Sequence, residues 1–373
     1  MIYLDNAATS YPKPREVLSA LSHTLENEGG NPGRSSHALS LAAAERIDET
    51  RIALAALIGA DDPSHILFTM NATHALNLAL KSRVKRGTHI LISDREHNAV
   101  YRPVCRLARD GIADFDVFST RGDVEKNILS LLRPNTDILI CNHVSNVDGA
   151  EAPIDVIGAL CARLGIYFIV DASQSIGHRP FSLRASQADA VCAPAHKGLF
   201  GIQGAGFVFL KSEKGLQTLI EGGSGSGSLD PEMPRALPER MEAGTPPTPA
   251  IAALGAGVRY LMDITPEAVF ARESALLLRL RERLEGLRGL QIYTSGVGGI
   301  LSMAAAAVTP DRMTELLDAE DICVRGGLHC APLAHAALGT QRTGTVRVSF
   351  SYHNTEADAD NLAAAVERIL KNA

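Results

Sequence analysis

The sequence lacks any apolar run long enough to span a membrane, and its start, MIYLDNAATS, lacks the basic and apolar segments of a signal peptide. It also lacks a large excess of one charge, because 36 basic and 42 acidic residues give a net charge of −6. This balance gives no electrostatic reason to expect a nucleic acid or an anionic membrane as partner. We therefore expect a cytoplasmic protein with no nucleic acid and no membrane among its partners.

Cysteine is sparse, with six residues in 373, and no two of them form a C-x-x-C pair. The closest two, Cys323 and Cys330, are seven residues apart, which suits neither a zinc site nor a disulfide framework. Cys141 and Cys192 lie inside apolar runs, where buried and inert thiols are expected. We therefore expect no metal site. Cys330, in VRGGLHCAPLAH, is compatible with a nucleophile and also with an ordinary loop thiol.

The length and pattern of the chain favour one large and one small domain. Short aliphatic runs alternate with helical patterns, which is typical of an α/β layer with a mainly parallel sheet. Buried strands are predicted at 89–94, 137–146, 167–173, 188–194 and 206–211. The last of these follows its predecessor closely enough to pair with it antiparallel. Helices are predicted at 14–27, 40–59 and 152–165.

Glycine, serine and proline dominate residues 222–249, so this segment is predicted to be a loop. Composition alone favours a flexible linker between domains. Helical periodicity resumes afterwards, and the end of the chain alternates helix, strand and helix, as expected for a small α+β domain. The predicted elements beyond the loop are helices at 249–264, 266–287, 309–320 and 355–372, and a strand at 345–352.

Polar residues follow several predicted strands, and ligands bind at the carboxyl ends of strands in open α/β sheets. These residues include Lys197, Asp171 and His97. A lysine amine can form a Schiff base with pyridoxal phosphate, and an acidic group can keep the pyridinium nitrogen protonated. The helix starting near Ala72 offers free N–H groups to a phosphate. Each residue also has a purely structural interpretation, with Asp171 a helix cap, Lys197 a solvated loop residue and His97 a satisfied histidine.

Nine motifs give the chain a specific resemblance. They are YLDNAATS, GGNPGRSSH, FTMNATHALN, REHNAV, HVSNVDG, VDASQSIG, HKGLFGIQG, EAGTPPTP and RGGLHCAP. Their order and spacing resemble the cysteine desulfurases, in the class V aminotransferase branch of the fold-type I pyridoxal phosphate enzymes. The likeness runs from residue 3 to about 355 and is closest to the short-loop, group II-like members.

The resemblance implies an α/β fold with a mainly parallel seven-stranded sheet in a large domain, 16–262. Residues 1–15 and 263–373 would form the small α+β domain. It implies a homodimer, because Thr245 matches a residue that reaches the neighbouring subunit's cofactor. Residues 222–249 would then be an active-site and interface loop rather than a linker.

Matching the motifs position by position implies roles for individual residues. Lys197 matches the Schiff-base lysine, Asp171 the pyridinium partner, Gln174 the partner of the ring hydroxyl, and His97 the histidine on the ring face that also handles protons. The phosphate contacts implied are Ala72 at the helix start, Thr73, His196 and Thr245. The substrate contacts implied are Asn146 and Arg347 for the carboxylate, and Arg34 and Arg325 near the entry. Cys330 matches the catalytic cysteine.

One motif departs from the family pattern. The family usually has a Ser-Gly-His-Lys run, whereas this chain has Pro194 and Ala195 before His196. A hydroxyl that binds phosphate is therefore absent, and its hydrogen bond must be missing or supplied by another group.

The implied reaction removes sulfur from L-cysteine through an aldimine of pyridoxal 5'-phosphate. Lys197 would take the α-proton, and the Cys330 thiolate would attack the substrate sulfur, leaving a persulfide and L-alanine. Gly326 and Gly327 would let the backbone turn. L-selenocysteine as substrate, an aminotransferase or epimerase reaction, and a catalytically silent sulfur-relay partner are the alternatives. A sulfur-acceptor protein is an expected partner, whose identity the sequence does not give.

Overall fold

The structure is a computed structural model that describes residues 1–33 and 36–372. Its helices, in chain order, are α1 (Arg15–Asn27), α2 (Ala38–Ile58), α3 (Ala72–Lys81), α4 (Asn98–Arg109), α5 (Val124–Leu129), α6 (Ile154–Leu164), α7 (Leu183–Ser186), α8 (Thr248–Ile264), α9 (Pro266–Leu284), α10 (Pro310–Asp318), α11 (Pro332–Leu338) and α12 (Glu356–Lys371). Its strands are β1 (Ile2–Tyr3), β2 (Ile66–Thr69), β3 (Thr88–Ser93), β4 (Ala113–Phe118), β5 (Thr136–Asn142), β6 (Tyr167–Asp171), β7 (Ala190–Pro194), β8 (Gly206–Leu210), β9 (Leu290–Tyr293), β10 (Ile300–Ala305), β11 (Ile322–Cys323), β12 (Arg325–Gly327) and β13 (Thr345–Ser349).

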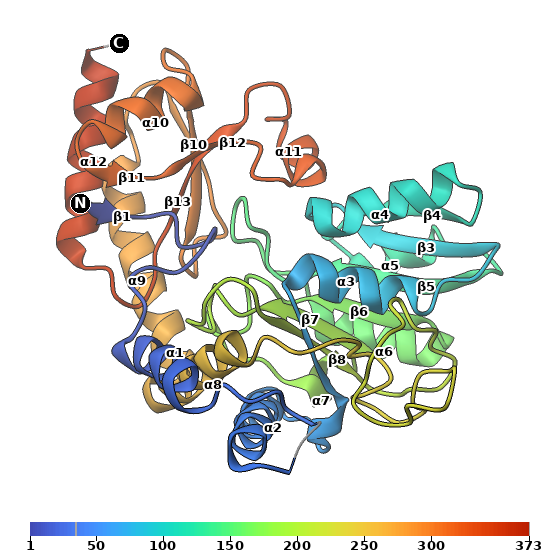
Figure 1. Ribbon diagram of the computed structural model, residues 1–373. Helices are drawn as coiled ribbons and strands as arrows, with labels where there is room; N and C mark the ends of the chain where they lie inside the picture. Colours follow the sequence, from blue (N-terminus) through green and yellow to red (C-terminus); the bar gives the residue numbers. More distant parts are fainter. Residues whose placement is uncertain (34–35, 373) are drawn as a thin grey trace.

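A seven-stranded sheet with the order β2-β8-β7-β6-β5-β3-β4 forms the centre of the larger part of the molecule (Figure 1). The pairs from β7 to β4 are parallel, whereas β8 runs antiparallel to both β7 and β2. The fold class and the antiparallel strand at 206–211 are thereby confirmed. Strands β3, β7 and β8 are buried along their whole length, as expected where helices cover both faces of a sheet.

The two faces of the sheet belong to two apolar clusters. In β5, Leu139 and Cys141 join one cluster, whereas Ile138 and Ile140 join the other, because successive side chains of a strand point to opposite faces. Helices α2, α5, α6 and α8 supply the first cluster, and α3 and α4 supply the second. The strand ends are therefore the part of the sheet left open to a ligand.

A second, smaller group of elements packs around its own apolar cluster, which α9, α10, α12, β10 and β13 supply. It contains a four-stranded sheet ordered β12-β13-β10-β9 and a parallel pair of β1 with β11 (Figure 1). The predicted C-terminal helices and the strand beginning at 345 are present, although β13 ends at Ser349. The domain limits of 16–262 and 263–373 stay a prediction.

One predicted strand is too long. Residues 137–146 were expected to be extended, but β5 ends at Asn142. The chain then turns back on itself, with Ser145 N–H bonded to the Ala150 carbonyl at 2.9 Å and Gly149 at a φ of 68°. The Asn, Asp and Gly residues of this segment favour a turn over a strand. This turn brings Asn146 under the C-terminal part of the molecule.

Residues 222–247 contain no helix or strand, as predicted, and α8 begins at Thr248. Within residues 1–33 and 36–372, no helix combines the length and the apolar character needed to cross a membrane.

Candidate active site

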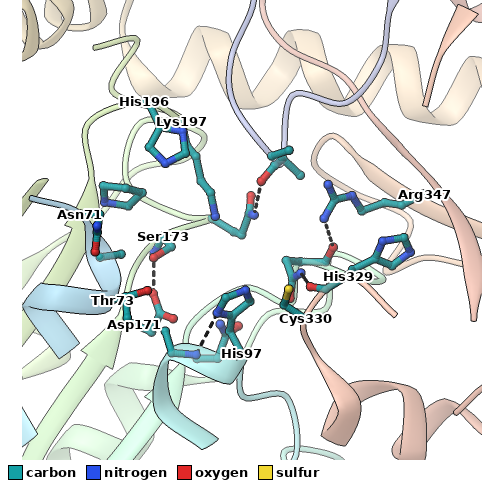
Figure 2. Close-up of a pocket in the computed structure, with 18 of the residues that line it drawn as sticks. Asn71, Thr73, His97, Asp171, Ser173, His196, Lys197, His329, Cys330 and Arg347 are labelled. Carbon is teal, nitrogen blue, oxygen red and sulfur yellow. Dashed lines mark hydrogen bonds between the residues drawn. The ribbon is translucent and has the colours of Figure 1, made fainter. Parts of the chain in front are cut away.

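A cavity of about 220 Å³ lies where the carboxyl ends of the central strands face the smaller part of the molecule. The ends of β3, β5, β6 and β7 contribute from one side, and β12, β13 and the segment before α11 contribute from the other (Figure 2). Of the residues predicted to form the site, those that line this cavity are Ala72, Thr73, His97, Asn146, Asp171, Gln174, His196, Lys197, Arg325, Cys330 and Arg347.

Two predicted site residues are not placed in this cavity. Thr245 is exposed in the loop before α8 and lines separate hollows with residues such as Phe68 and Asp48. Arg34 lies outside the residues that the structure describes.

Lys197 follows β7 and lines the cavity wall, where its side chain is partly buried. Burial lowers the pKa of its amine to about 8, although the negative charge of Asp171 opposes this shift. The backbone next to Lys197 packs closely against Ile176. Only glycine fits at position 198, because a Cβ there would lie 2.4 Å from the Ile176 carbonyl oxygen. The sequence therefore places an amine that is partly uncharged near neutral pH beside a carboxylate.

Asp171 and Gln174 are oriented by the backbone. The Ser173 N–H donates to Asp171 Oδ1 at 3.0 Å, and the Gln174 side-chain amide donates to the Ala7 carbonyl at 2.9 Å. Both residues are almost fully buried. Since the amide nitrogen of glutamine carries two hydrogens, Gln174 keeps a second donor for a ligand.

The N-terminus of α3 faces the cavity with unpaired donors. Asn71 caps this helix by accepting from the His74 N–H at 2.9 Å, whereas the N–H groups of Ala72 and Thr73 have no partner within the helix. His196 Nδ1 is buried without a partner, and burial lowers the pKa of its imidazole to about 4. This end of the cavity can therefore bind an anion through neutral donors and the helix dipole.

A lysine that sequence reasoning missed lies behind this end of the cavity. The Lys13 ammonium donates to Ser10 Oγ at 2.8 Å and to the His196 carbonyl at 3.1 Å. Burial lowers its pKa to about 8, and no carboxylate forms an ion pair with it among the described residues. Its contact with His196 joins positions that are 183 residues apart, so no local pattern signals it.

His97 caps α4 and faces the cavity. Its Nδ1 accepts from the Ala99 N–H at 3.0 Å, so in the neutral ring the hydrogen lies on Nε2. Burial, assisted by the positive charge of Lys197, lowers the pKa of the ring to about 4. His97 is therefore neutral at pH 7 and can present an N–H donor.

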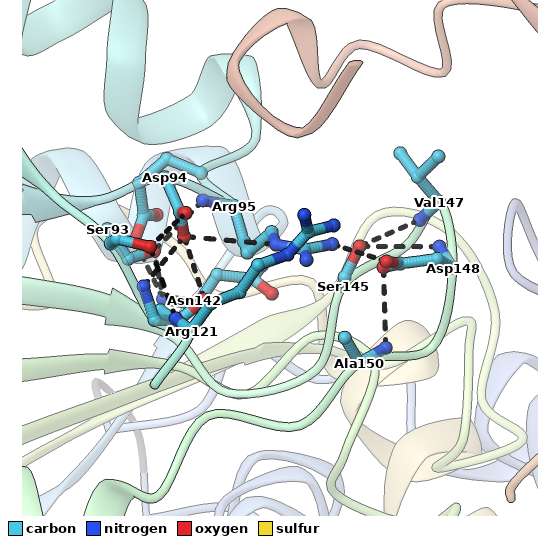
Figure 3. Close-up of polar contacts among 12 residues, drawn as sticks. Ser93, Asp94, Arg95, Arg121, Asn142, Ser145, Val147, Asp148 and Ala150 are labelled. Atoms are coloured by element: carbon cyan, nitrogen blue, oxygen red, sulfur yellow. Dashed lines mark hydrogen bonds and ion pairs between the residues drawn. The ribbon is translucent and has the colours of Figure 1, made fainter. Parts of the chain in front are cut away.

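Arg347 on β13 is buried and held in place by two acceptors. Its guanidinium donates to Asp5 Oδ1 at 2.7 Å and to the Asn146 carbonyl at 3.1 Å, while Nε has no partner. The turn that carries Asn146 is in turn tied to the β3–α4 connection by the buried ion pair of Arg95 with Asp148 (Figure 3). The remaining N–H groups of Arg347 suit a planar carboxylate.

The Cys330 segment is anchored through its backbone and leaves the side chain exposed. The Asn98 N–H donates to the Cys330 carbonyl at 2.7 Å, and the Asn146 amide donates to the His329 carbonyl at 2.8 Å. His329 and Cys330 both have left-handed backbones, with φ of 49° and 57°, a conformation that is uncommon for residues other than glycine. The backbone is thus constrained, while the sulfur opens on the cavity (Figure 2).

The histidines near Cys330 do not carry positive charge at neutral pH. His329 is buried and contacts Thr345 Oγ1 through Nε2 at 3.1 Å, and burial lowers its pKa to about 2. Burial also lowers the pKa of His335, whose Nδ1 contacts Thr340 Oγ1 at 2.7 Å. Among these neighbours of Cys330, the permanent cation that can favour a thiolate is Arg325, which lines the cavity.

Comparison with known proteins agrees with this geometry. The profile of the family described as aminotransferase class-V matches residues 2–362. The chain therefore belongs to the class-V aminotransferases. Within this family its relatives include a probable cysteine desulfurase of Methanothermobacter thermautotrophicus, 30% identical over 99% of this chain and 94% of the relative.

Two solved structures share the whole fold. The apo structure of cysteine desulfurase from Thermococcus onnurineus NA1 has a TM-score of 0.90 and 28% identity, and the match covers 100% of this chain and 95% of that one. The cysteine desulfurase CsdA (S-sulfonic acid) from Escherichia coli has a TM-score of 0.89 and 28% identity, with 99% and 94% covered. The predicted resemblance to the cysteine desulfurases is confirmed.

Proposed function

We propose that this chain is a pyridoxal phosphate-dependent cysteine desulfurase that transfers the sulfur of L-cysteine to Cys330 and releases L-alanine. The observation that carries the proposal is the placement of the exposed Cys330 thiol on the same cavity as the Lys197 amine and the buried Asp171 carboxylate. A thiolate is the side chain suited to accept a sulfur atom.

The cavity fits pyridoxal phosphate by the chemistry of its donors. Lys197 would hold the cofactor covalently, Asp171 and Gln174 would bind its ring, and His97 would lie against the ring face. The phosphate would bind Ala72, Thr73 and His196, whose buried Nδ1 lacks a partner in the chain. When bound, the cofactor supplies an electron sink for negative charge at the substrate Cα.

Residues of the chain would carry out the proton transfers and the sulfur transfer. An uncharged Lys197 amine can accept the proton from the substrate Cα, and the Nε2 hydrogen of His97 is available for proton transfer at the ring face. The Cys330 thiolate attacks the substrate sulfur. The carbon–sulfur bond breaks, its electron pair stays with the substrate carbon, which takes a proton, and a sulfur–sulfur bond forms on Cys330.

The phosphate end gives a first prediction. Because Lys13 is a partly buried cation without an anionic partner, we infer that it replaces the electrostatic contribution of the absent serine at Pro194. Replacement of Lys13 by Met should weaken equilibrium binding of pyridoxal phosphate to the apo protein about 10-fold, a loss of about 1.4 kcal/mol. Binding of pyridoxal, which has no phosphate, should change little, and Lys13→Arg should retain most of the affinity. Equal weakening for both ligands would instead mean that Lys13 only supports the fold.

The substrate end gives a second prediction. We infer that Arg347 and Asn146 hold the substrate carboxylate. Arg347→Lys keeps the positive charge beside Asp5 but loses the planar fork, so KM for L-cysteine should rise about 10-fold while kcat changes much less. Arg342→Lys, on an exposed loop, is the matched control and should behave as the parent protein. An unchanged KM in Arg347→Lys would remove Arg347 from substrate binding.

We also propose that the chain works as a homodimer in the cytoplasm and passes its sulfur to an acceptor protein. The exposed position of Thr245, away from its own cavity, supports the dimer, since a partner subunit's cavity would give it a phosphate to bind. The mass of the protein in solution tests this arrangement.

The direct test of the function is incubation of the purified protein with pyridoxal phosphate and L-cysteine. Equal amounts of alanine and transferred sulfur are expected, with the persulfide located on Cys330 by mass spectrometry. Transfer from L-selenocysteine alone would support the selenocysteine lyase alternative, and release of no alanine from either substrate would contradict the proposal.

A further inference from the structure

Glu96 is a buried acid for which the proposed mechanism has no use. It lies between β3 and α4, directly before His97, and its side chain is wholly inaccessible to solvent. Its Oε1 accepts from Ser93 Oγ at 2.5 Å and from the Asn142 backbone N–H at 2.7 Å. Ser93 and Asn142 lie together at the ends of neighbouring strands (Figure 3). Glu96 is thus fixed against the sheet edge from which the cavity opens.

The other oxygen of Glu96 has no partner. Oε2 is buried without a hydrogen bond, and so is Oδ1 of Asn142, which lines the cavity. Both atoms are acceptors if Glu96 is ionised, so neither can satisfy the other. A proton on Oε2 makes this oxygen a donor, and buried polar atoms are rarely left unpaired.

The charges around Glu96 also oppose its ionisation. Asp171 on β6 and Cys141 on β5 are the titratable groups that face it from the packed strands, and neither carries positive charge. Burial is the largest cause that raises the pKa of Glu96, to about 8, and the negative charge of Asp171 adds to it. The hydrogen bonds from Ser93 and Asn142 act in the opposite direction and do not overcome burial.

We propose that Glu96 is a positioning residue held as the uncharged carboxylic acid, whose Oε2 hydroxyl donates to Oδ1 of Asn142 and fixes this side chain at the cavity. Asp171, the register partner of Asn142 on β6, then has no second anion beside it. Any benefit of this arrangement for the cofactor rests on the proposed function, because it requires that Asp171 pairs with the ring nitrogen of the cofactor.

Infrared spectroscopy tests the protonation state without any turnover. At pH 7 the wild-type protein should show the carbonyl stretch of a protonated carboxylic acid, which shifts when glutamate but not aspartate is labelled with ¹³C. The stretch should be absent in Glu96→Gln and present in Asp94→Asn, a matched control at the same turn whose carboxylate accepts from Ser119 and Thr120. Absence of a glutamate-derived band in the wild type would overturn the proposal.

The pH dependence of unfolding gives a second test. The folded-state pKa of Glu96, about 8, lies above the ordinary value of 4.5, so the folded protein binds more protons than the unfolded chain between these values. As the pH rises through this window, the wild-type protein should therefore lose stability relative to Glu96→Gln. The urea midpoint of the variant minus that of the wild type should increase from pH 5 to pH 8. A midpoint difference that is constant, or that moves the other way, contradicts an uncharged Glu96.

These two measurements distinguish this inference from the proposed function. If the protein shows the glutamate band but releases no alanine, the proposal of an uncharged Glu96 stands and the proposed desulfurase function is wrong. In the holoenzyme, Glu96→Gln should keep the affinity for pyridoxal phosphate within about twofold and the pH profile of its visible absorption below pH 8, because the amide reproduces both the shape and the donor. A large shift of that profile would mean that Glu96 is charged.

Discussion

Replacement of Cys330 by Ala should abolish the formation of alanine and persulfide from L-cysteine. The expected loss is at least about 10³-fold in kcat/KM, equivalent to about 4 kcal/mol of transition-state stabilisation, because no other thiol lines the cavity among the described residues. The backbone contacts of this segment use carbonyl groups, so alanine should leave the fold and cofactor binding intact. Alanine release in timed samples and the mass of the protein after incubation measure the effect.

Cys105→Ala is the matched control for this variant. Cys105 is a free, partly exposed thiol on α4 that does not line the cavity. Its replacement should leave alanine formation within experimental scatter and the persulfide on Cys330. If Cys330→Ala still releases alanine at the parent rate, sulfur leaves by a route that needs no protein thiol, and the transfer mechanism is wrong.

Replacement of Lys197 by Ala should remove both the yellow colour expected of the purified holoenzyme and its turnover. The loss of activity should again be on the order of 10³-fold or more, since the variant lacks both the covalent attachment point and the proton acceptor. Burial lowers the pKa of Lys197 to about 8, and only the uncharged amine reacts with an aldehyde. Cofactor capture by the wild-type apo protein should therefore become faster as the pH rises from 6 to 9 and level off above about 8.

The control is Lys211→Ala, because Lys211 is exposed just after β8 and does not line the cavity. This variant should capture the cofactor with the wild-type rate and pH profile. A Lys197→Ala protein that remains yellow after dialysis and turns over cysteine would exclude Lys197 from both roles. A capture rate independent of pH would instead show that the amine is already uncharged throughout the range.

The sequence predicts the central elements well where its local pattern is strong. The runs that became β3, β6, β7 and β8 are continuous and aliphatic because helices cover both faces of the sheet. The sequence of β4, ADFDVF, gives only a weak strand pattern, because this edge strand is buried only at its two end residues and carries two aspartates. Helix α4 was also missed, and Pro103 in its interior weakens its helical pattern.

In the candidate site, too, some residues can be predicted from local sequence patterns and others cannot. Lys197, Asp171 and His97 each follow a strand or begin a helix, so a topological rule places them at one edge of the sheet. The pairing of Arg347 with Asp5 and the contact of Lys13 with His196 join residues that are 342 and 183 positions apart. Nothing in a local pattern signals such contacts, which appear only when the chain is folded. The uncharged state suggested for Glu96 likewise depends on burial and on a neighbouring strand.

The anchoring of the Cys330 segment has a consequence for any protein that collects the sulfur. Asn98 and Asn146 bind the carbonyl groups of Cys330 and its neighbour, so the start of α4 and the turn after β5 hold the backbone of this residue, while its side chain stays exposed. A persulfide sulfur on Cys330 would therefore be attached to a fixed backbone, and only rotation of the side chain would move it between the cavity and the solvent. An acceptor would therefore have to bring its accepting group to the rim of the cavity, because the segment between β12 and α11 is short and its carbonyl groups are held.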